Sequence, residues 1–518
     1  MTPTDLYDRV VPPWESSLHP AVRHLFAELD EVGKRPWMWV DHWAEQVPDA
    51  VAISDSDETW TWRHLRREVH RWSARVGAAA APGGVVALSA RKRPAVVAAM
   101  IGVMRAGNVV LVVDTDESPE RLAAVLSDVQ PSLRFGDPGA FPGVDPVTVR
   151  SFDFDGPGGP DVVAAEPGEL DAAWITFTSG STGVPKGMTT THGMLTQRAA
   201  EGRRFVIISE RPVVSGFHEF TFMGVVKSVF GGLAAGAHVR LFRPRLESVP
   251  SILSTIQEQR LTVLHGPPQL MRPLWSSCEP DDPRLATVRR VRFGADRTQP
   301  ADLRAALRCL PDGCEVVIAY GSGELGSIAE VQYRRGDTIP TGRLPVGYPE
   351  AWVEVTPVDD DGAPVPRGEV GVVEIRSHGY TALPFPPPAD GVPPATLRNG
   401  DTARILDGGS LDLVGRADAR VKIDGVGVDL NEVDAVLQSH PAVDQAVCIL
   451  AERSDRRAEI VAVVLASKPI EGRELRETCR SLPPASRPTS FRFVDAFPTN
   501  RRNKVDRNVV EALVAAGG

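Results

Sequence analysis

The chain has 518 residues, of which 42% are hydrophobic and 24% charged, and its formal net charge is −10. This length is too great for one hydrophobic core, so we expect about three domains or subdomains. The acidic balance argues against nonspecific binding to nucleic acid or to a membrane surface, because both favour basic proteins.

Short apolar runs alternate with helix-like stretches between residues 40 and 135, among them "GGVVALSA" and "GNVVLVVD". This rhythm predicts βαβ units and a parallel sheet. It returns in three apolar runs that each close with Gly: "LTVLHGPP", "VRRVRFGA" and "CEVVIAYGSG". Ligands collect at the carboxyl edge of parallel strands, so we expect these ends and the loop at 177–187 to line one crevice.

The segment 177–193, "FTSGSTGVPKGMTTTHG", gathers glycines and small hydroxyl residues around Lys186. A strand-like run, "AAWITF", precedes it, and a helix-like run, "MLTQRAAEGRRF", follows it. Strand, Gly-rich loop and helix is an arrangement in which backbone N–H groups converge on an anion. We therefore predict a phosphate loop, with Lys186 supplying charge and Ser179, Ser181 and Thr182 supplying hydroxyl donors. A solvated linker is the alternative interpretation.

The loop does not follow the Walker A pattern. That pattern requires Gly-Lys-Ser/Thr after four intervening residues, whereas Pro185 precedes Lys186 and Gly187 follows it. The sequence therefore predicts a phosphate loop of another kind.

The pattern changes at about residue 345. "AWVEVTPV" and "GEVGVVEIRS" alternate as antiparallel strands do, and the Pro-rich segment 380–394 excludes a helix or a central strand. After "GRADARVK" a compact α+β pattern follows, with "NEVDAVLQSH" as a helix and "AVDQAVCIL" and "AEIVAVVLA" as strands. We place a domain boundary near residue 416.

Six motifs occur in a characteristic order along the chain. They are "VVDTDESPERLAAVLSD" (112–128), "TSGSTGVPKG", "AYGSGE" (319–324), "RNGD" (398–401), "GRADARVKIDG" (415–425) and "NRRNKVDR" (500–507). Together they resemble the adenylate-forming superfamily of acyl-CoA synthetases, nonribosomal peptide synthetase adenylation domains and luciferases, and most closely its freestanding adenylation enzymes. In that family they correspond to a segment before the phosphate loop, the loop itself, the Tyr-Gly-x-Thr-Glu and Thr-Gly-Asp elements, the hinge and the C-terminal Gly-Lys motif.

The resemblance implies an α/β fold in two parts. Residues 1–415 would form the adenylation core, with mixed and parallel sheets, flanking helices and a small β-barrel-like subdomain. Residues 416–418 would be the hinge, and residues 419–518 a small mobile α+β lid.

The implied reaction has two steps and depends on ATP and Mg²⁺. A carboxylate attacks the α-phosphate of ATP, which gives an acyl adenylate and pyrophosphate, and a thiol then takes the acyl group. The first step requires charge neutralisation around crowded phosphates, by Mg²⁺, Lys and backbone dipoles. We expect an AMP-forming ligase that loads the phosphopantetheine thiol of an acyl or peptidyl carrier protein.

The resemblance also assigns site residues. Those implied for ATP binding are Thr178, Ser179, Gly180, Ser181, Thr182, Gly183, Lys186, Tyr320, Gly321, Ser322, Asp401 and Arg416. Lys504, Glu324 and Lys186 would be the catalytic residues, with Glu324 also the Mg²⁺ ligand and Asp418 the hinge residue.

The individual roles differ in chemistry. Tyr320 would stack on adenine, and Asp401, supported by Arg416, would accept hydrogen bonds from the ribose hydroxyls. Lys504 would contact the carboxylate and the α-phosphate as a point charge. Taken alone, each residue is equally compatible with a structural role: Tyr320 as a core aromatic, Asp401 as an acid in a turn, and Lys504 as a solvated charge.

Two residues depart from the family pattern. Gly323 stands where a Thr or Ser hydroxyl usually contacts the α-phosphate, and a hydrogen bond to a charged group is typically worth about 1–3 kcal/mol. Asn503 replaces the Gly before Lys504.

The predicted acid pocket comprises His218, Phe222, Met223, Lys227 and Gly294. The stretch 217–237 resembles the peptide-synthetase sequence "FHSFAFDFSVWEIWGALL", and Met223 takes the place of the Asp that pairs with an α-ammonium group. A Met cannot balance a buried ammonium, so we do not expect an ordinary α-amino acid as substrate.

Two pocket residues have alternative interpretations. Lys227 would lie on the same helical face as Met223 and pair with an anionic or polar group of the acid, or it would snorkel to solvent. His218 would lie beside the acyl or phosphate group, or be a structural His.

Other functions stay open from sequence alone. An acid–CoA ligase has the same first step, and Met223 and Gly323 are compatible with an atypical member that uses a non-thiol acceptor or nitrite (an amide ligase or diazotase). A non-catalytic nucleotide-binding regulator would be expected to lack some of the key charged residues, which are all present. The chain ends soon after Lys504, so we expect no carrier domain on its C-terminal side.

The expected compartment is the cytoplasm. The five cysteines have no metal-ligand spacing, and an odd, sparse set is typical of reduced thiols. The N-terminus lacks a signal-peptide pattern, and no apolar stretch has the length and composition to span a bilayer.

Overall fold

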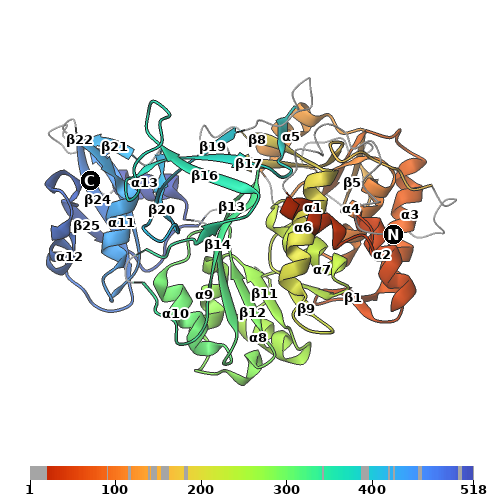
Figure 1. Ribbon diagram of the computed structural model, residues 1–518, viewed down its shortest axis with the longest axis horizontal. Helices are drawn as coiled ribbons and strands as arrows, with labels where there is room; N and C mark the ends of the chain where they lie inside the picture. Colours follow the sequence, from red (N-terminus) through yellow and green to blue (C-terminus); the bar gives the residue numbers. More distant parts are fainter. Residues whose placement is uncertain are drawn as a thin grey trace.

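The protein is described here by a computed structural model (Figure 1). It describes residues 20–89, 91–114, 118–137, 141, 149–152, 163–179, 185–244, 246–340, 343–386, 396–417, 420–423, 426–452, 458–499 and 505–516.

A seven-stranded sheet contains the first predicted βαβ units. Its strand order is β18-β8-β7-β4-β3-β5-β6, and β3 pairs in parallel with both β4 and β5, as the sequence predicts. The bounds are β3 (Val85–Ser89), β4 (Val109–Val112), β5 (Leu133–Gly136), β6 (Arg150–Ser151), β7 (Ala172–Ser179), β8 (Pro185–Thr191) and β18 (Leu383–Phe385).

Helices cover this sheet. α4, "PAVVAAMIGVMR", consists almost entirely of apolar residues, and such a helix belongs in a core. The helices of this part are α1 (Pro20–Ala27), α2 (Pro36–Gln46), α3 (Trp62–Gly77), α4 (Pro94–Arg105), α5 (Pro119–Val129) and α6 (His192–Val206).

A nine-stranded sheet has the order β15-β14-β13-β12-β11-β9-β10-β1-β2. The three runs that close with Gly are its neighbouring parallel strands β11, β12 and β13, so their carboxyl ends do share one edge. The strands are β1 (Val51–Ser54), β2 (Thr59–Thr61), β9 (Val213–Gly216), β10 (His238–Leu241), β11 (Val263–Gly266), β12 (Arg290–Phe293), β13 (Glu315–Ser322), β14 (Gly326–Tyr333) and β15 (Tyr348–Pro349). The helices here are the π-helix η3 (Val226–Phe230), α7 (Gly231–Ala234), α8 (Val249–Glu258), α9 (Pro268–Ser276), η4 (Pro283–Leu285) and α10 (Pro300–Cys309).

A third, four-stranded sheet is antiparallel, which confirms the alternation seen after residue 345. Its strands are β16 (Val353–Val358), β17 (Gly371–Ser377), β19 (Thr396–Ile405) and β20 (Leu411–Arg416). In the described part of the Pro-rich segment, residues 380–386, the chain forms the short β18, which lies at the edge of its sheet, where a missing backbone donor is tolerated.

The C-terminal elements (blue in Figure 1) lie together beyond β20. They are β21 (Arg420–Ile423), β22 (Val426–Asp429), α11 (Leu430–Gln438), β23 (Val443–Glu452), β24 (Ala458–Ala466), α12 (Gly472–Thr478), η6 (Cys479–Ser481), η7 (Pro484–Ser486), β25 (Ser490–Phe493) and α13 (Arg507–Ala516). The predicted helix and the two predicted strands are confirmed, and the strands, β23 and β24, pair antiparallel.

The hydrophobic clusters divide along the chain. The two clusters of the C-terminal elements contain only residues from Val421 onward, and the remaining clusters contain no residue after Leu413. The predicted fold class, a large mixed α/β part and a smaller α+β part, is confirmed, while the positions of the boundary and hinge stay predictions. All five cysteines are free and buried. Among the described residues, no helix combines the length and apolar character needed to cross a membrane.

Candidate active site

The predicted phosphate loop connects two strands, and the expected strand–loop–helix order is wrong. β7 and β8 pair antiparallel on either side of the loop, and α6 begins only after β8. The run Thr189–Thr191 is β-branched and favours a strand, and the Thr191 hydroxyl then accepts from the Met194 N–H at 3.3 Å as the N-cap of α6. The loop residues 180–184 and the side chains of residues 178–186, Lys186 among them, lie outside the described part of the chain.

Three residues assigned to the nucleoside meet in one hydrogen-bonded cluster. The Tyr320 hydroxyl, on β13, donates to Asp401 Oδ2 on β19 at 2.7 Å. Arg416, paired with Asp401 across β19 and β20, lies with Nη1 3.6 Å from Asp401 Oδ1. The sequence missed one member, Asn399, whose Nδ2 donates to both Tyr320 Oη and Asp401 Oδ2 at 2.7 Å.

The backbone of this cluster depends on Gly400. Its φ is +80°, and a Cβ there would lie 3.0 Å from Arg416 Nη2, so this position inside β19 favours Gly. Burial is the main cause that raises the pKa of Tyr320, which keeps its hydroxyl a neutral donor. The cluster therefore presents a fixed carboxylate beside a fixed aromatic ring.

Glu324 lies in the turn between β13 and β14, and this turn is held from three sides. Arg198 of α6 donates through Nη2 to the Gly323 carbonyl at 2.6 Å, and Leu325 N donates to Ser322 Oγ at 3.2 Å. Ala382 N donates to the Glu324 carbonyl at 2.8 Å, which leaves the carboxylate outside these contacts.

The described residues contain no group of three or more His, Cys, Asp or Glu suited to hold a metal ion alone. A single half-buried carboxylate at Glu324 nevertheless fits Mg²⁺, because this ion is commonly held by one or two carboxylates together with substrate phosphates.

Gly323 contacts a side chain that the sequence did not single out. A Cβ at Gly323 would lie 3.1 Å from Met188 Cε and 3.3 Å from its Sδ. Met188 is buried on β8. The space beside this glycine is therefore partly filled by a thioether.

The contacts of the predicted pocket residues Met223, His218 and Phe222 are largely apolar. Met223 is buried, with Sδ 3.6 Å from Thr190 Oγ1. The His218 ring stacks on Phe222 at 5.5 Å between centroids, and burial is the main cause that lowers its pKa to about 3. Gly294 faces open space, since a Cβ there would meet only the Ala319 carbonyl oxygen at 3.9 Å.

Lys227 does not snorkel to solvent. Its side chain is only 14% exposed, its Nζ lies 2.6 Å from Glu201 Oε2, and it donates to Ser327 Oγ. The shared helical face with Met223 is also wrong, because Lys227 belongs to the π-helix η3 and Met223 to the turn before it. η3 packs closely against α6, where a Cβ at Gly202 would lie 2.3 Å from the Lys227 carbonyl oxygen.

Of the remaining predicted site residues, Gly321 and Ser322 lie at the end of β13, beside the cluster. Asp418 and Lys504 lie outside the described residues. The structure thus brings together Tyr320 at the carboxyl end of β13, in the nine-stranded sheet, and Asp401 and Arg416 of the four-stranded sheet. The Glu324 turn is close by in sequence, and the roles of these residues toward a nucleotide stay predictions.

The comparisons with known families define a class, the adenylate-forming enzymes. The family model for AMP-binding enzymes matches residues 40–382, and that for the AMP-binding enzyme C-terminal domain matches residues 432–504. The chain therefore belongs to the AMP-binding enzyme family, which confirms the resemblance and the assignment to the AMP-forming ligases.

Individual relatives agree with this membership. Bacitracin synthase 1 of Bacillus licheniformis is 26% identical over 484 residues, a match that covers 90% of this chain and 9% of the relative. A structure of Klebsiella oxytoca NpsA in complex with 3-hydroxyanthranilyl-AMSN is 20% identical, with a TM-score of 0.78 and coverage of 93% and 99% of the two chains. ATP-bound MatB from Rhodopseudomonas palustris is also 20% identical, with a TM-score of 0.74 and coverage of 92% and 98%.

Proposed function

We propose that this protein activates a carboxylic acid with ATP as an acyl adenylate, releases pyrophosphate and transfers the acyl group to a carrier-protein phosphopantetheine thiol. The observation that carries the proposal is the cluster of Tyr320, Asn399, Asp401 and Arg416, which is complete without a ligand. A carboxylate fixed in this way can accept from both hydroxyls of a ribose, while the ring of Tyr320 offers a flat surface to adenine.

The triphosphate would lie in the loop between β7 and β8. Lys186 and the loop hydroxyls would neutralise and orient it, and Glu324 would hold Mg²⁺ together with phosphate oxygens. When bound, Mg²⁺ would stabilise the negative charge that develops on the α-phosphate and the leaving pyrophosphate. Lys504 would approach the carboxylate from the C-terminal part.

The acid is not an ordinary α-amino acid. Met223 offers a thioether where an α-ammonium group would need a carboxylate, and a buried ammonium without a partner is costly. The similarity to NpsA, whose structure holds a 3-hydroxyanthranilyl group, supports an acid without an α-amino group. The similarity to a peptide synthetase supports a carrier protein as acceptor. The free cysteines support a reducing compartment such as the cytoplasm.

The test is ATP-dependent release of pyrophosphate across a panel of acids, followed by loading of a holo carrier protein or of CoA. We expect release with one acid class and acyl transfer to the carrier protein. Transfer to CoA alone would make the protein an acid–CoA ligase, and transfer to an amine an amide ligase. Absence of release with every acid and with nitrite, in a protein that binds ATP, would contradict the proposal.

A further inference from the structure

The hydroxyl of Ser327, on β14, lies between two cations. Arg292 Nη2, on β12, donates to Ser327 Oγ at 2.9 Å, and Lys227 Nζ, on η3, donates to the same oxygen. Ser327 is 3% exposed. A hydroxyl has two lone pairs and one hydrogen, and neither a guanidinium nor an ammonium can accept that hydrogen. Both lone pairs are therefore occupied, and the hydrogen must point away from both cations.

The Ser327 hydrogen has no acceptor in the described part of the chain, where the two cations are the only partners of this hydroxyl. A buried donor without an acceptor is unfavourable, and it calls for an explanation. The cations also fix the direction of the O–H bond, since each of them occupies one lone pair. The protein thus holds a preoriented hydrogen-bond donor whose acceptor is missing.

The two cations are already balanced by carboxylates. Lys227 Nζ lies 2.6 Å from Glu201 Oε2, and Arg292 Nη1 lies 2.7 Å from Glu330 Oε2. Burial, and then the charges of Glu330 and Glu201, raise the pKa of Glu350 to about 7, so another negative charge is unfavourable in this region. A neutral acceptor group therefore suits the Ser327 hydroxyl better than an anionic one.

Printed contacts connect Ser327 to the predicted acid pocket. The His218 ring of the pocket lies 4.6 Å from the His265 ring between centroids, and His265 on β11 lies opposite Arg292 on β12. Phe205 of α6 contacts both of these neighbours, with its ring centroid 6.2 Å from that of His265 and 5.3 Å from Arg292 Cζ. The contacts thus run from His218 through His265 and Arg292 to Ser327.

The space beside these strands is open at Gly294, another predicted pocket residue. Gly294 follows β12 and comes two residues after Arg292, so the alternation of an extended chain puts both on one face. A Cβ at Gly294 would meet only the Ala319 carbonyl oxygen within 4 Å, at 3.9 Å. Ser327 pairs with Gly321, two residues after Ala319 on β13. A substituent of the acid at Gly294 would therefore lie next to the strands that carry Arg292 and Ser327.

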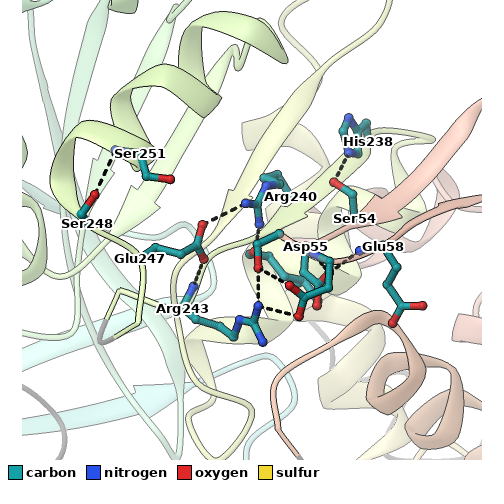
Figure 2. A network of polar contacts seen from close by, with 12 residues as sticks. Ser54, Asp55, Glu58, His238, Arg240, Arg243, Glu247, Ser248 and Ser251 are labelled. Atoms are coloured by element: carbon teal, nitrogen blue, oxygen red, sulfur yellow. Dashed lines mark hydrogen bonds and ion pairs between the residues drawn. The ribbon is translucent and has the colours of Figure 1, made fainter.

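Another ion network in the protein differs from this one in a telling way (Figure 2). Glu247 lies between Arg240 and Arg243, and it accepts from Arg240 Nη2 at 2.9 Å and from Arg243 N at 2.6 Å. Arg243 Nη2 lies 2.8 Å from Asp57 Oδ2, in the turn between β1 and β2. These pairs connect β10 to that turn, which accounts for them without a ligand. At Ser327, by contrast, a donor is left over.

We propose that Ser327 donates its hydroxyl hydrogen to a neutral acceptor on the acid that is activated, a carbonyl or hydroxyl oxygen at the end away from the reacting carboxylate. The inference rests on the proposed function for the identity of the pocket. Ser327 is then the residue that selects this substrate class. Lys227 and Arg292 are positioning residues that act through its hydroxyl, so Lys227 does not pair directly with the acid, as the sequence suggested.

The test compares pyrophosphate exchange for acids of equal shape. One series is isocaproate, levulinate and succinate, and the other is meta-isopropylbenzoate, meta-acetylbenzoate and isophthalate. Each series presents a branched alkyl group, a ketone or a second carboxylate at the same place. We expect the wild-type protein to prefer the keto acid of the series that it accepts, over both the alkyl acid and the dicarboxylate.

Ser327→Ala should lower kcat/KM for the keto acid about 10- to 100-fold, the range of one lost hydrogen bond that leaves its partner unsatisfied, and leave the alkyl acid within about twofold. Ser327→Thr keeps the hydroxyl and should retain the preference for the keto acid. Ser73→Ala is the matched control, because Ser73 is also a buried serine that accepts from a guanidinium, Arg105 Nη1 at 3.2 Å, but lies on α3. It should leave the preference unchanged.

A thermal-shift arm tests the site without turnover. The keto acid should raise the Tm of the wild-type protein more than the alkyl acid does, and this difference should vanish in Ser327→Ala and persist in Ser327→Thr. Equal losses for the keto and alkyl acids in Ser327→Ala, or a wild-type protein that prefers the alkyl acid or the dicarboxylate in both measurements, would overturn the inference. Absence of exchange with every acid would contradict the proposed function alone, since the Tm comparison still decides whether Ser327 recognises the ketone.

Discussion

Because Gly323 lies against Met188, we expect the effects of Gly323→Thr on stability and on rate to depend on whether Met188 is also replaced. Gly323→Thr supplies the hydroxyl that the family pattern has at this position. Its Cβ would lie 3.1 Å from Met188 Cε and 3.3 Å from Sδ, closer than ordinary van der Waals contact, and its γ atoms add further volume. Because Met188 is buried, we expect this overpacking to cost about 1–3 kcal/mol of unfolding free energy.

Met188→Val removes the two atoms concerned. In the double variant the new hydroxyl is accommodated and can donate to the α-phosphate, a bond worth about 1–3 kcal/mol. We therefore expect Gly323→Thr alone to be destabilised, and the double variant to regain stability and exceed the wild-type rate of pyrophosphate exchange by about tenfold or more.

The assay is a double-mutant cycle, with urea unfolding for stability and pyrophosphate exchange for activity. We expect a coupling free energy of about 1 kcal/mol or more between the two sites. Additive effects on both measurements, or a Gly323→Thr protein as stable as the wild type, would refute it.

Three further predictions concern single groups. Asn399→Ala removes both amide hydrogen bonds of the nucleoside cluster and should weaken ATP binding about tenfold by calorimetry, and an unchanged Kd would contradict its role. Lys227→Met leaves the buried carboxylate of Glu201 without its cation and should lower the unfolding free energy by about 3–5 kcal/mol in urea. Adding Glu201→Gln should recover most of this loss, whereas additive losses would show that the two residues act independently. Burial, with nearby acids, raises the pKa of Glu350 from 4.5 to about 7, so the folded protein retains a proton that the unfolded chain releases. Unfolding free energy should therefore fall as pH rises across that window, by at most about 3 kcal/mol, and Glu350→Gln should remove this part of the pH dependence.

Strands and helices could be predicted from the sequence where the spacing of apolar residues and the length of the apolar run determine them. The parallel strands β11–β13 were visible as apolar runs closed by Gly, and the described part of the Pro-rich segment, residues 380–386, forms an edge strand and no central one. Around the phosphate loop the pattern was ambiguous, because "TTTHG" begins with β-branched residues that continue a strand and ends with residues that begin a helix.

Contacts between distant segments were not predictable from local patterns. The partner of Lys227 is Glu201, and nothing in either local pattern indicates that a π-helix lies directly against α6. The contact between Met188 and Gly323 likewise depends on how separate strands meet. Asn399 had a signal, its place inside "RNGD", but only the geometry shows its double donation.

The central claim is that a nucleotide binds where the carboxyl end of β13 meets β19 and β20 of the four-stranded sheet, with its phosphates in the loop between β7 and β8. A crystal structure with a non-hydrolysable ATP analogue and Mg²⁺ tests it most directly. We predict the ribose hydroxyls on Asp401, adenine against Tyr320 and the metal on Glu324. A nucleotide bound elsewhere, with the Tyr320–Asp401 hydrogen bond undisturbed and no ligand beside it, would contradict the account.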